Sequence, residues 1–359
     1  MDFKNGFFNN FISRCIALKN KFFSSIQLDA KEGDTLGNRI AKSLTRAQVF
    51  LFLLILLAGT SYGTLSHFSS ARGAKNVEAA VAKTIPPAVT ILPQKYFENI
   101  ELEAKAVYVL DVVNGKVLYE KNGNVPLPLA SLVKVMTALV GSDLVPKDSV
   151  IEIDGNALSK EGDTGLALGE KWNFQELIDF TLLVSSNDGA SAIREKADLI
   201  LGERDGVGYQ ASDFIREMNV KVAELGLKDT RFLNETGLDE NTEEAGGYGS
   251  ARDMAQLFSF IITQKPRLLE ATKYDGLMIK SLDGILHDLV NTRKNSLAIP
   301  SILGSKTGFT NLAQGNFLVA FDAGLRYPIV IAVLGSSQEG RFADAQRLAN
   351  ATLDYLNQK

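Results

Sequence analysis

The sequence predicts an α+β domain whose antiparallel sheet is built from both ends of the domain, preceded by one transmembrane helix. Three observations lead to this prediction. Strand patterns open the domain at 105–120 and return at 302–335. Helical patterns fill most of the sequence between them, as expected for a sheet interrupted by a helical insertion. An apolar segment without charged residues, 47–66, precedes all of these elements.

The apolar segment 47–66 is long enough to span a bilayer, because about 20 residues are needed. Residues 1–46 carry eight basic and four acidic side chains, and this excess places the N-terminus in the cytoplasm and the domain outside. We therefore predict a cytoplasmic tail over 1–46, a lipid-embedded signal anchor over 47–66, a linker over 67–96 and a domain over 97–359. A cleaved signal peptide and a buried soluble helix are alternative interpretations of the apolar segment.

Composition excludes several classes of function. Beyond residue 46 the chain has 30 basic and 38 acidic residues, a net charge of −8, so no nucleic-acid partner is expected. The single cysteine excludes an intramolecular disulfide and a cysteine-based metal centre. With only two histidines, His67 and His287, a His-rich metal site is excluded too, and we predict no metal or organic cofactor.

The domain is predicted to begin with a hairpin and a buried helix. Residues 105–112 form a strand pattern, Asn114-Gly115 is a typical hairpin turn, and 116–120 returns as a second strand. Residues 131–141 follow as an apolar helix.

The helical insertion continues with four patterns, at 172–184, 187–201, 209–226 and 251–264. The first two meet at Ser185-Ser186. Ser250 and Asp253 resemble a capping box at the start of the 251–264 helix. We therefore expect both residues to have a structural role and not a catalytic one.

The last part of the domain returns to strands. Residues 275–280 and 284–289 flank Asp283-Gly284 as a second hairpin. The remaining elements are strands at 302–309, 315–322 and 327–335 and a closing helix at 340–357. A functional site is expected in a cleft between the sheet and the helical insertion.

The candidate chemistry begins with Ser131 and Lys134. Three residues separate them, so their side chains share one face of the predicted helix. A lysine kept partly neutral by burial can take the proton of a serine hydroxyl, and a helix N-terminus favours developing negative charge. A Ser-x-x-Lys pattern occurs about once by chance in a chain of this length, so taken alone it is more simply a polar pair.

Two further segments could join this pair. Ser185-Ser186-Asn187 offers hydroxyls and an amide at a helix junction, where helix capping is the simpler explanation for one segment alone. Lys306-Thr307-Gly308 lies in an extended segment that could form the edge of the sheet. It offers an ammonium group, a hydroxyl and a backbone that a substrate can approach closely, although a polar strand end would look the same.

Together, and in this order, the three motifs resemble the set that marks the active-site-serine penicillin-recognising enzymes. Within that group the chain is similar to the low-molecular-mass D-Ala-D-Ala carboxypeptidases. The stretches that carry the similarity include Pro128–Thr137, Leu182–Asp188, Ser250–Ala255 and Gly304–Thr310. The resemblance covers roughly residues 97–357 and implies a β-lactamase/transpeptidase-like fold.

The resemblance implies a role for each residue on the helical side of the site. Ser131 is the expected nucleophile, which forms an acyl-enzyme, and Lys134 is its general base. Ser185 and Asn187 are expected to relay protons and to position the substrate.

The resemblance also implies roles for the strand and the closing helix. Lys306 would supply positive charge, and Thr307 would contact the substrate carboxylate. Gly308 belongs to the same substrate-binding motif, and the N–H groups of Ser131 and Phe309 would form an oxyanion hole. Arg341 resembles the family's basic residue that helps to hold the terminal carboxylate.

The implied function is removal of the terminal D-alanine from peptidoglycan stem peptides at the bacterial cytoplasmic membrane, with β-lactam antibiotics as acylating inhibitors. A murein D,D-endopeptidase and a non-catalytic penicillin-binding module that tethers to the wall remain alternatives. A class A β-lactamase would need a glutamate after the second motif, and Glu203, Glu217 and Glu235 are candidates. A Ser-His-Asp hydrolase is disfavoured, because His287 lies in a predicted hairpin and is assigned to structure.

Overall fold

The computed structural model describes residues 94–358, apart from 163, 206–212 and 294–297. The predicted tail and transmembrane helix lie outside these residues, and within them no helix is long and apolar enough to cross a bilayer. Residues 94–96, placed in the linker by the sequence analysis, belong to α3 (Gln94–Phe97). The rings of Tyr96 and Phe97 pack against those of Tyr355 and Tyr119, so this end of the predicted linker contacts the domain.

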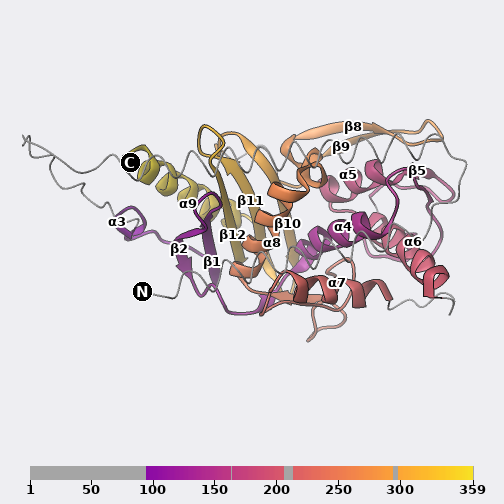
Figure 1. Ribbon diagram of the computed structural model, residues 1–359, viewed down its shortest axis with the longest axis horizontal. Coiled ribbons are helices and arrows are strands. Elements are labelled where there is room, and N and C mark those ends of the chain that lie inside the picture. Colours follow the sequence, from indigo (N-terminus) through magenta and orange to yellow (C-terminus); the bar gives the residue numbers. More distant parts are fainter. Residues whose placement is uncertain (1–93, 163, 206–212, 294–297, 359) are drawn as a thin grey trace, which may run out of the picture. The chain divides into compact units, whose positions relative to one another are not determined.

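A five-stranded antiparallel sheet of order β10-β11-β12-β1-β2 forms the centre of the domain (Figure 1). Its strands are β1 (Ala106–Asp111), β2 (Lys116–Lys121), β10 (Ile302–Thr310), β11 (Gln314–Asp322) and β12 (Pro328–Ser336). β1 pairs with β12, with Ala106 opposite Leu334, so the sheet joins the two ends of the domain as predicted. β10 is an edge strand, which also confirms its predicted place.

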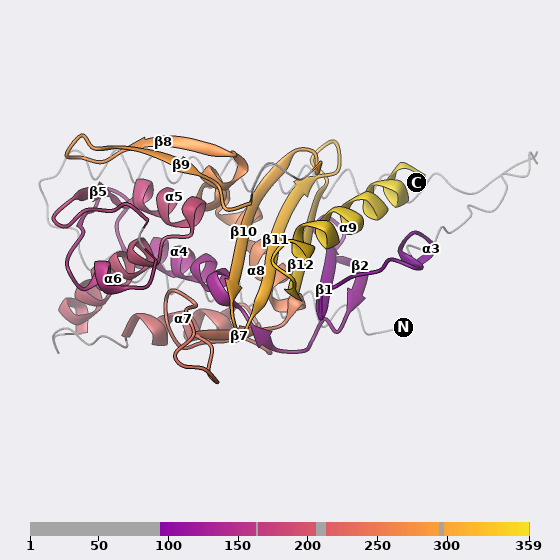
Figure 2. The same ribbon diagram turned by 180° about the vertical axis from the view of Figure 1, so that it is seen from behind.

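Both faces of the three central strands, β11, β12 and β1, are buried. Along β1, Tyr108 and Leu110 enter one hydrophobic core, whereas Val107 and Val109 enter the other, because successive strand side chains point to opposite faces. The helix α8 (Ala251–Gln264) packs on the first face and α9 (Gly340–Asn357) on the second (Figure 2). The sheet is therefore a rigid support for the side chains at its edges.

The helical insertion lies beyond the β10 edge of the sheet (Figures 1 and 2). Its elements are η1 (Ala130–Leu132), α4 (Val133–Leu144), α5 (Phe174–Val184), α6 (Asn187–Asp205) and α7 (Asp213–Glu224). The α5 helix starts two residues later than predicted, because Lys171–Asn173 form β5 and pair with β4 (Val150–Glu152). The Asn173 side chain then caps α5 by accepting from the Gln175 N–H.

Short elements complete the domain: β3 (Leu127–Pro128), η2 (Ala157–Ser159), β6 (Arg231–Phe232), β7 (Gly247–Gly249), η3 (Pro266–Leu269) and η4 (Ala271–Lys273). The second predicted hairpin is β8 (Gly276–Lys280) with β9 (Leu286–Val290). On β9, the His287 ring bonds Glu170 Oε1 at 2.7 Å and packs against Trp172 and Phe180, which agrees with its assignment to structure.

Candidate active site

Ser131 lies in η1, the short turn that precedes α4. Its neighbour Ala130 is fully buried and has a φ of +49°, a left-handed conformation that is unusual for a residue other than glycine. Ser131 itself is partly exposed. Neither η1 nor α4 has a side-chain cap, so the serine hydroxyl is not used to cap the helix and remains available for chemistry.

The Lys134 amine makes three polar contacts. Its Nζ lies 2.9 Å from Ser131 Oγ, 2.6 Å from Asn187 Oδ1 and 2.7 Å from the Thr236 carbonyl oxygen. The last two oxygens can only accept, so a neutral amine gives both of its protons to them. Its lone pair then faces Ser131, which is the orientation that a base needs.

The environment of Lys134 keeps the amine close to neutrality. The side chain is fully buried, and this burial lowers the pKa of Lys134 to about 7. The carboxylates of Glu235 and Asp188 oppose this effect and raise the pKa of the amine. A substantial fraction of Lys134 is therefore neutral near pH 7.

The Thr236 carbonyl is held in place by the loop that contains it. The Asn234 side chain accepts from the N–H groups of Thr236 and Gly237, at 3.2 and 2.7 Å. Gly237 has a φ of +79°, and a Cβ on it would lie 1.9 Å from the Ala130 carbonyl oxygen. Glycine thus lets the loop pack directly against the segment that carries Ser131.

In the second motif, Ser186 has a structural role, whereas Ser185 and Asn187 contact the lysines of the site. Ser186 caps α6, because its hydroxyl accepts from the Gly189 N–H at 2.9 Å. Ser185 ends α5 with a φ of +65°, and its Oγ accepts from Lys306 Nζ at 2.7 Å. Asn187 donates its amide to the Glu161 carbonyl, which orients its oxygen toward Lys134.

The third motif forms the strand side of the site. Lys306 is buried, and its amine also lies 2.9 Å from the Thr307 carbonyl oxygen. Burial lowers the pKa of Lys306 well below its usual range, and the charges of Lys134 and Arg341 lower it further. The Thr307 hydroxyl shares a 2.6 Å hydrogen bond with the hydroxyl of Thr292.

Gly308 brings β10 against the nucleophile segment. A Cβ at Gly308 would lie 2.9 Å from the Leu129 carbonyl oxygen and 3.2 Å from the Ser131 nitrogen. Asn316 of β11 supports the same contact by donating to the Pro128 carbonyl oxygen at 2.9 Å. The Ser131 backbone and the strand that continues to Phe309 are therefore neighbours.

Arg341 lies in the first turn of α9, and the residue is 6% exposed. One Nη donates to the Gly308 carbonyl oxygen at 2.7 Å, so the side chain supports β10 at the point nearest Ser131. Burial lowers the pKa of Arg341 to about 10. Its predicted contact with a substrate carboxylate stays a prediction.

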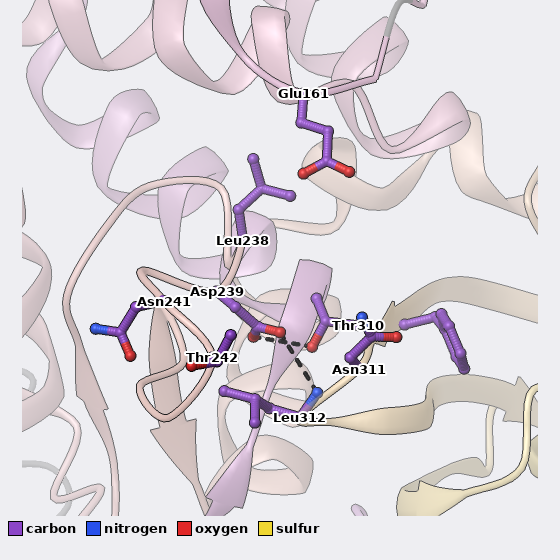
Figure 3. A pocket seen from close by; sticks show the side chains of 9 residues that line it. Glu161, Leu238, Asp239, Asn241, Thr242, Thr310, Asn311 and Leu312 are labelled. Carbon is purple, nitrogen blue, oxygen red and sulfur yellow. Dashed lines mark hydrogen bonds between the residues drawn. The ribbon is translucent and has the colours of Figure 1, made fainter.

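A pocket of about 520 Å³ adjoins the end of β10 (Figure 3). Phe309 and Thr310 line one wall, and Glu161, Leu238 and Asp239 line the others. Asp239 accepts from the Thr310 hydroxyl and from the Leu312 N–H, at 2.9 and 3.4 Å, which joins its loop to the strand. The pocket is therefore bordered by Glu161, whose carbonyl accepts from Asn187, and by the strand residues that follow Gly308.

The three motifs thus form one connected site, as predicted. A family model described as D-alanyl-D-alanine carboxypeptidase matches residues 93–338, more than half of the chain. The chain belongs to the D-alanyl-D-alanine carboxypeptidase family.

Individual members and solved structures agree with this family. The D-alanyl-D-alanine carboxypeptidase DacF of Bacillus subtilis is 30% identical over 252 residues, which cover 68% of this chain and 61% of DacF. A D-alanyl-D-alanine endopeptidase of Pseudomonas aeruginosa is 29% identical, over 76% of this chain and 83% of its own length. The ampicillin-bound structure of penicillin-binding protein D2 from Listeria monocytogenes has 27% identity and a TM-score of 0.57, covering 70% and 98% of the two chains.

Three residues that contact the site were not predicted from the sequence: Thr236, Thr292 and Asn316. Thr236 takes part through a backbone carbonyl, which leaves no side-chain signal. Thr292 and Asn316 are single polar residues without a recognisable motif. The stretch from Asn234 to Asp239 resembles the carboxypeptidase family in sequence, but this resemblance did not indicate that the Thr236 carbonyl accepts from Lys134.

The glutamates considered for a β-lactamase do not face the nucleophile. Glu203 is exposed near the end of α6, and Glu217 lies on α7 beside Arg216. The Glu235 carboxylate accepts from Ser191 at 2.6 Å and pairs with Arg194, so its bonds run to α6. Among the described residues, no group of three or more His, Cys, Asp and Glu side chains could hold a metal ion.

Proposed function

We propose that this protein is a serine-type D-Ala-D-Ala carboxypeptidase that removes the terminal D-alanine of peptidoglycan stem peptides and is acylated by β-lactam antibiotics. The observation that carries the proposal is the setting of Lys134. Two fixed acceptors, Asn187 Oδ1 and the Thr236 carbonyl, direct the lone pair of the neutral amine toward Ser131 Oγ.

Acylation follows from this arrangement. Lys134 takes the hydroxyl proton as Ser131 Oγ attacks the carbonyl carbon of the penultimate D-alanine. The oxygen of that carbonyl becomes negatively charged, and the N–H groups of Ser131 and Phe309 are proposed to stabilise it. Loss of one such donor typically lowers the rate about 100- to 1,000-fold.

The leaving group is the amine of the terminal D-alanine. The proton that Lys134 took from Ser131 passes through the Ser185 hydroxyl, which is bonded to Lys306, to this amine, so Lys134 becomes neutral again and Ser185 is unchanged. Thr307 and Lys306 hold the terminal carboxylate. Breaking the peptide bond releases D-alanine and leaves the shortened peptide as an ester on Ser131. Water then attacks the ester carbon while Lys134 takes a proton from the water. The bond to Ser131 Oγ breaks, Lys134 returns the proton to that oxygen, and the shortened peptide leaves as a free acid.

The rest of the stem peptide is proposed to lie in the pocket at the end of β10 (Figure 3). Two of its lining residues, Glu161 and Asp239, carry carboxylates. If the third residue of the stem peptide carries a free amino group, these carboxylates would attract it to the pocket. An acidic residue at that position of the peptide would be repelled.

The proposal is tested by incubating the full-length protein with a D-Ala-D-Ala-terminated pentapeptide. We expect D-alanine release that penicillin blocks and that Ser131→Ala abolishes. Acylation by penicillin without D-alanine release would show that the site is competent but that the substrate differs. Absence of both would refute the assignment.

A D,D-endopeptidase is the second candidate, because the chain covers 83% of the Pseudomonas aeruginosa endopeptidase against 61% of DacF. It would use the same residues on the peptide cross-link. Incubation with cross-linked muropeptide dimers separates the two functions: appearance of monomers without D-alanine release from the pentapeptide would favour the endopeptidase.

We also propose that residues 47–66 anchor the enzyme in the bacterial cytoplasmic membrane, with the N-terminus inside. The apolar length of this segment and the basic residues before it support the proposal. Protease protection of spheroplasts provides the test, because external protease should degrade the domain and spare the tail. Release of the domain without protease would indicate a cleaved signal peptide instead.

A further inference from the structure

A buried ion cluster lies behind the base, and the reaction described above does not use it. Glu235 is 4% exposed, and its Oε1 accepts from Ser191 Oγ at 2.6 Å. The same oxygen lies 3.4 Å from Arg194 Nε and 3.9 Å from Lys160 Nζ. A buried carboxylate is expensive unless it is paired and hydrogen-bonded, as this one is.

The position of the cluster connects it to Lys134 through two routes. Glu235 directly precedes Thr236, whose carbonyl accepts from Lys134. Ser191 and Arg194 lie four and seven residues after Asn187 on α6, so all three side chains occupy one helix face. The Glu235 backbone is also fixed to α4, because its carbonyl accepts from Thr137 Oγ1 at 2.7 Å.

We propose that Glu235 is a positioning residue for the base: its carboxylate clamps the 234–238 loop to α6 and so fixes the two oxygens that hold the Lys134 amine. This inference rests on the proposed role of Lys134 as the general base. Without the clamp, the Thr236 carbonyl and Asn187 Oδ1 would be free to separate, and the lone pair of Lys134 would lose its orientation toward Ser131.

The clamp has an electrostatic consequence as well. The negative charge of Glu235 raises the pKa of Lys134 against the larger effect of burial. Arg194, which lies on α6, partly neutralises that charge, since its Nε pairs with the Glu235 carboxylate. Removing the Glu235 charge should therefore lower the pKa of Lys134, and removing the Arg194 charge should raise it.

Other ionisable groups also face this region. Those around the clamp and the base are Lys160, Asp188, Glu195, Asp198 and, from β10, Lys306. Burial and the neighbouring Asp154 raise the pKa of Glu195 to about 7, so it titrates together with Lys134. A pH–rate curve alone would combine the two groups, and the test must observe Lys134 directly.

The experiment is a pH titration of the full-length protein carrying ¹³Cε-labelled lysine, followed by NMR, with the Lys134 signal assigned by its absence in Lys134→Arg. In Glu235→Gln we expect the Lys134 midpoint to fall by about 0.5–1 pH unit, and in Arg194→Gln to rise by a similar amount. Glu224→Gln, which removes an exposed carboxylate on α7, is the matched control and should leave the midpoint unchanged.

Penicillin acylation at pH 8.5 tests the positioning role, because Lys134 is then mostly neutral in all variants. We expect Glu235→Ala to acylate about 10- to 100-fold more slowly. Glu235→Gln should recover most of that loss, because an amide oxygen still accepts from Ser191.

Midpoints that stay fixed, or that move in the same direction in both charge variants, would overturn the proposal. So would Glu235→Ala acylating at the wild-type rate. If Glu235→Gln does not fold, the sign of the Arg194→Gln shift decides. A wild-type protein that penicillin does not acylate would refute the proposed function instead, and the Lys134 titration would still test the clamp.

Discussion

The helices α8 and α4 each begin beside a serine, and these two serines are used differently. At the start of α8, the Ser250 hydroxyl accepts from the Asp253 N–H at 3.1 Å and caps the helix. Before α4, the Ser131 hydroxyl makes no cap and instead lies 2.9 Å from Lys134 Nζ. Ser250 is fully buried, whereas Ser131 is partly exposed.

The difference shows how a common residue becomes a nucleophile. A serine at a helix start normally stabilises the helix by about 1 kcal/mol, and α4 does without this contribution. Its approach also includes the left-handed Ala130, a conformation that costs of order 1 kcal/mol or more. Local stability is therefore lower at the helix start that carries the chemistry, and the packing of Gly237 and Gly308 against it holds it in place.

Replacing the two serines by alanine should give opposite results, and Ser131→Ala should have the largest effect on activity. We expect loss of acylation by about 10⁴-fold or more, because Ser131 carries the hydroxyl that lies against Lys134 Nζ. The melting temperature should change by less than about 1 °C, because no cap is lost. Mass spectrometry of the penicillin adduct and thermal unfolding measure the two quantities; an adduct that persists in Ser131→Ala would place the nucleophile elsewhere.

The next largest effect is the pH dependence of acylation. Ser131 needs a neutral base to act as a nucleophile, whereas the capping bond of Ser250 needs no base. Lys134 acts only when neutral, and the pKa of its amine is about 7. As pH falls below this value, the neutral fraction and hence acylation should drop about tenfold per pH unit. Stopped-flow acylation by a chromogenic β-lactam between pH 5 and 9 measures this limb. A rate that is flat down to pH 5 would show that Lys134 is not the base.

The same comparison explains what could be predicted from the sequence. The helix that begins at Ala251 and the strand carrying Lys306 follow from apolar patterns and were predicted within a residue. The pairing of Ser131 with Lys134 follows from helix geometry. Nothing local distinguishes a capping serine from a nucleophile, so only the combination of the three motifs indicated which serine is which.

The other contacts of the site could not be predicted from the sequence, because they join segments that are distant along the chain. The hold on Lys134 by the Thr236 carbonyl involves a backbone group that any residue could provide. The Glu235–Arg194 pair spans helix and loop without a periodic pattern. Arg341 was identified by resemblance, but its bond to the Gly308 carbonyl required the packing of α9 on the sheet.

A smaller effect on activity is expected when the support of Ser131 is disturbed. In Gly308→Ala the new Cβ would lie 2.9 Å from the Leu129 carbonyl oxygen, so β10 must move away from the nucleophile segment. We expect acylation to slow about 10- to 100-fold, since a shift of about 1 Å in a catalytic group has this consequence. Gly304→Ala on the same strand is the control, because its Cβ would meet its nearest atom at the same distance, 2.9 Å, but that atom belongs to the Leu269 side chain and not to the nucleophile segment. Equal loss of acylation in both variants would indicate general damage to the strand.

Ser250→Ala should have the smallest effect and completes the comparison. The variant loses the hydrogen bond to the Asp253 N–H, and we expect unfolding to require about 1 kcal/mol less, a shift of about 2–4 °C in melting temperature. Acylation should stay within about twofold of wild type, because α8 packs on the sheet and contributes no group to the contacts around Ser131. Thermal unfolding and penicillin acylation, measured on the same preparation, give both numbers. A loss of acylation larger than the stability change explains would mean that the start of α8 also positions the site, and that the two serines are less separate in function than their hydrogen bonds indicate.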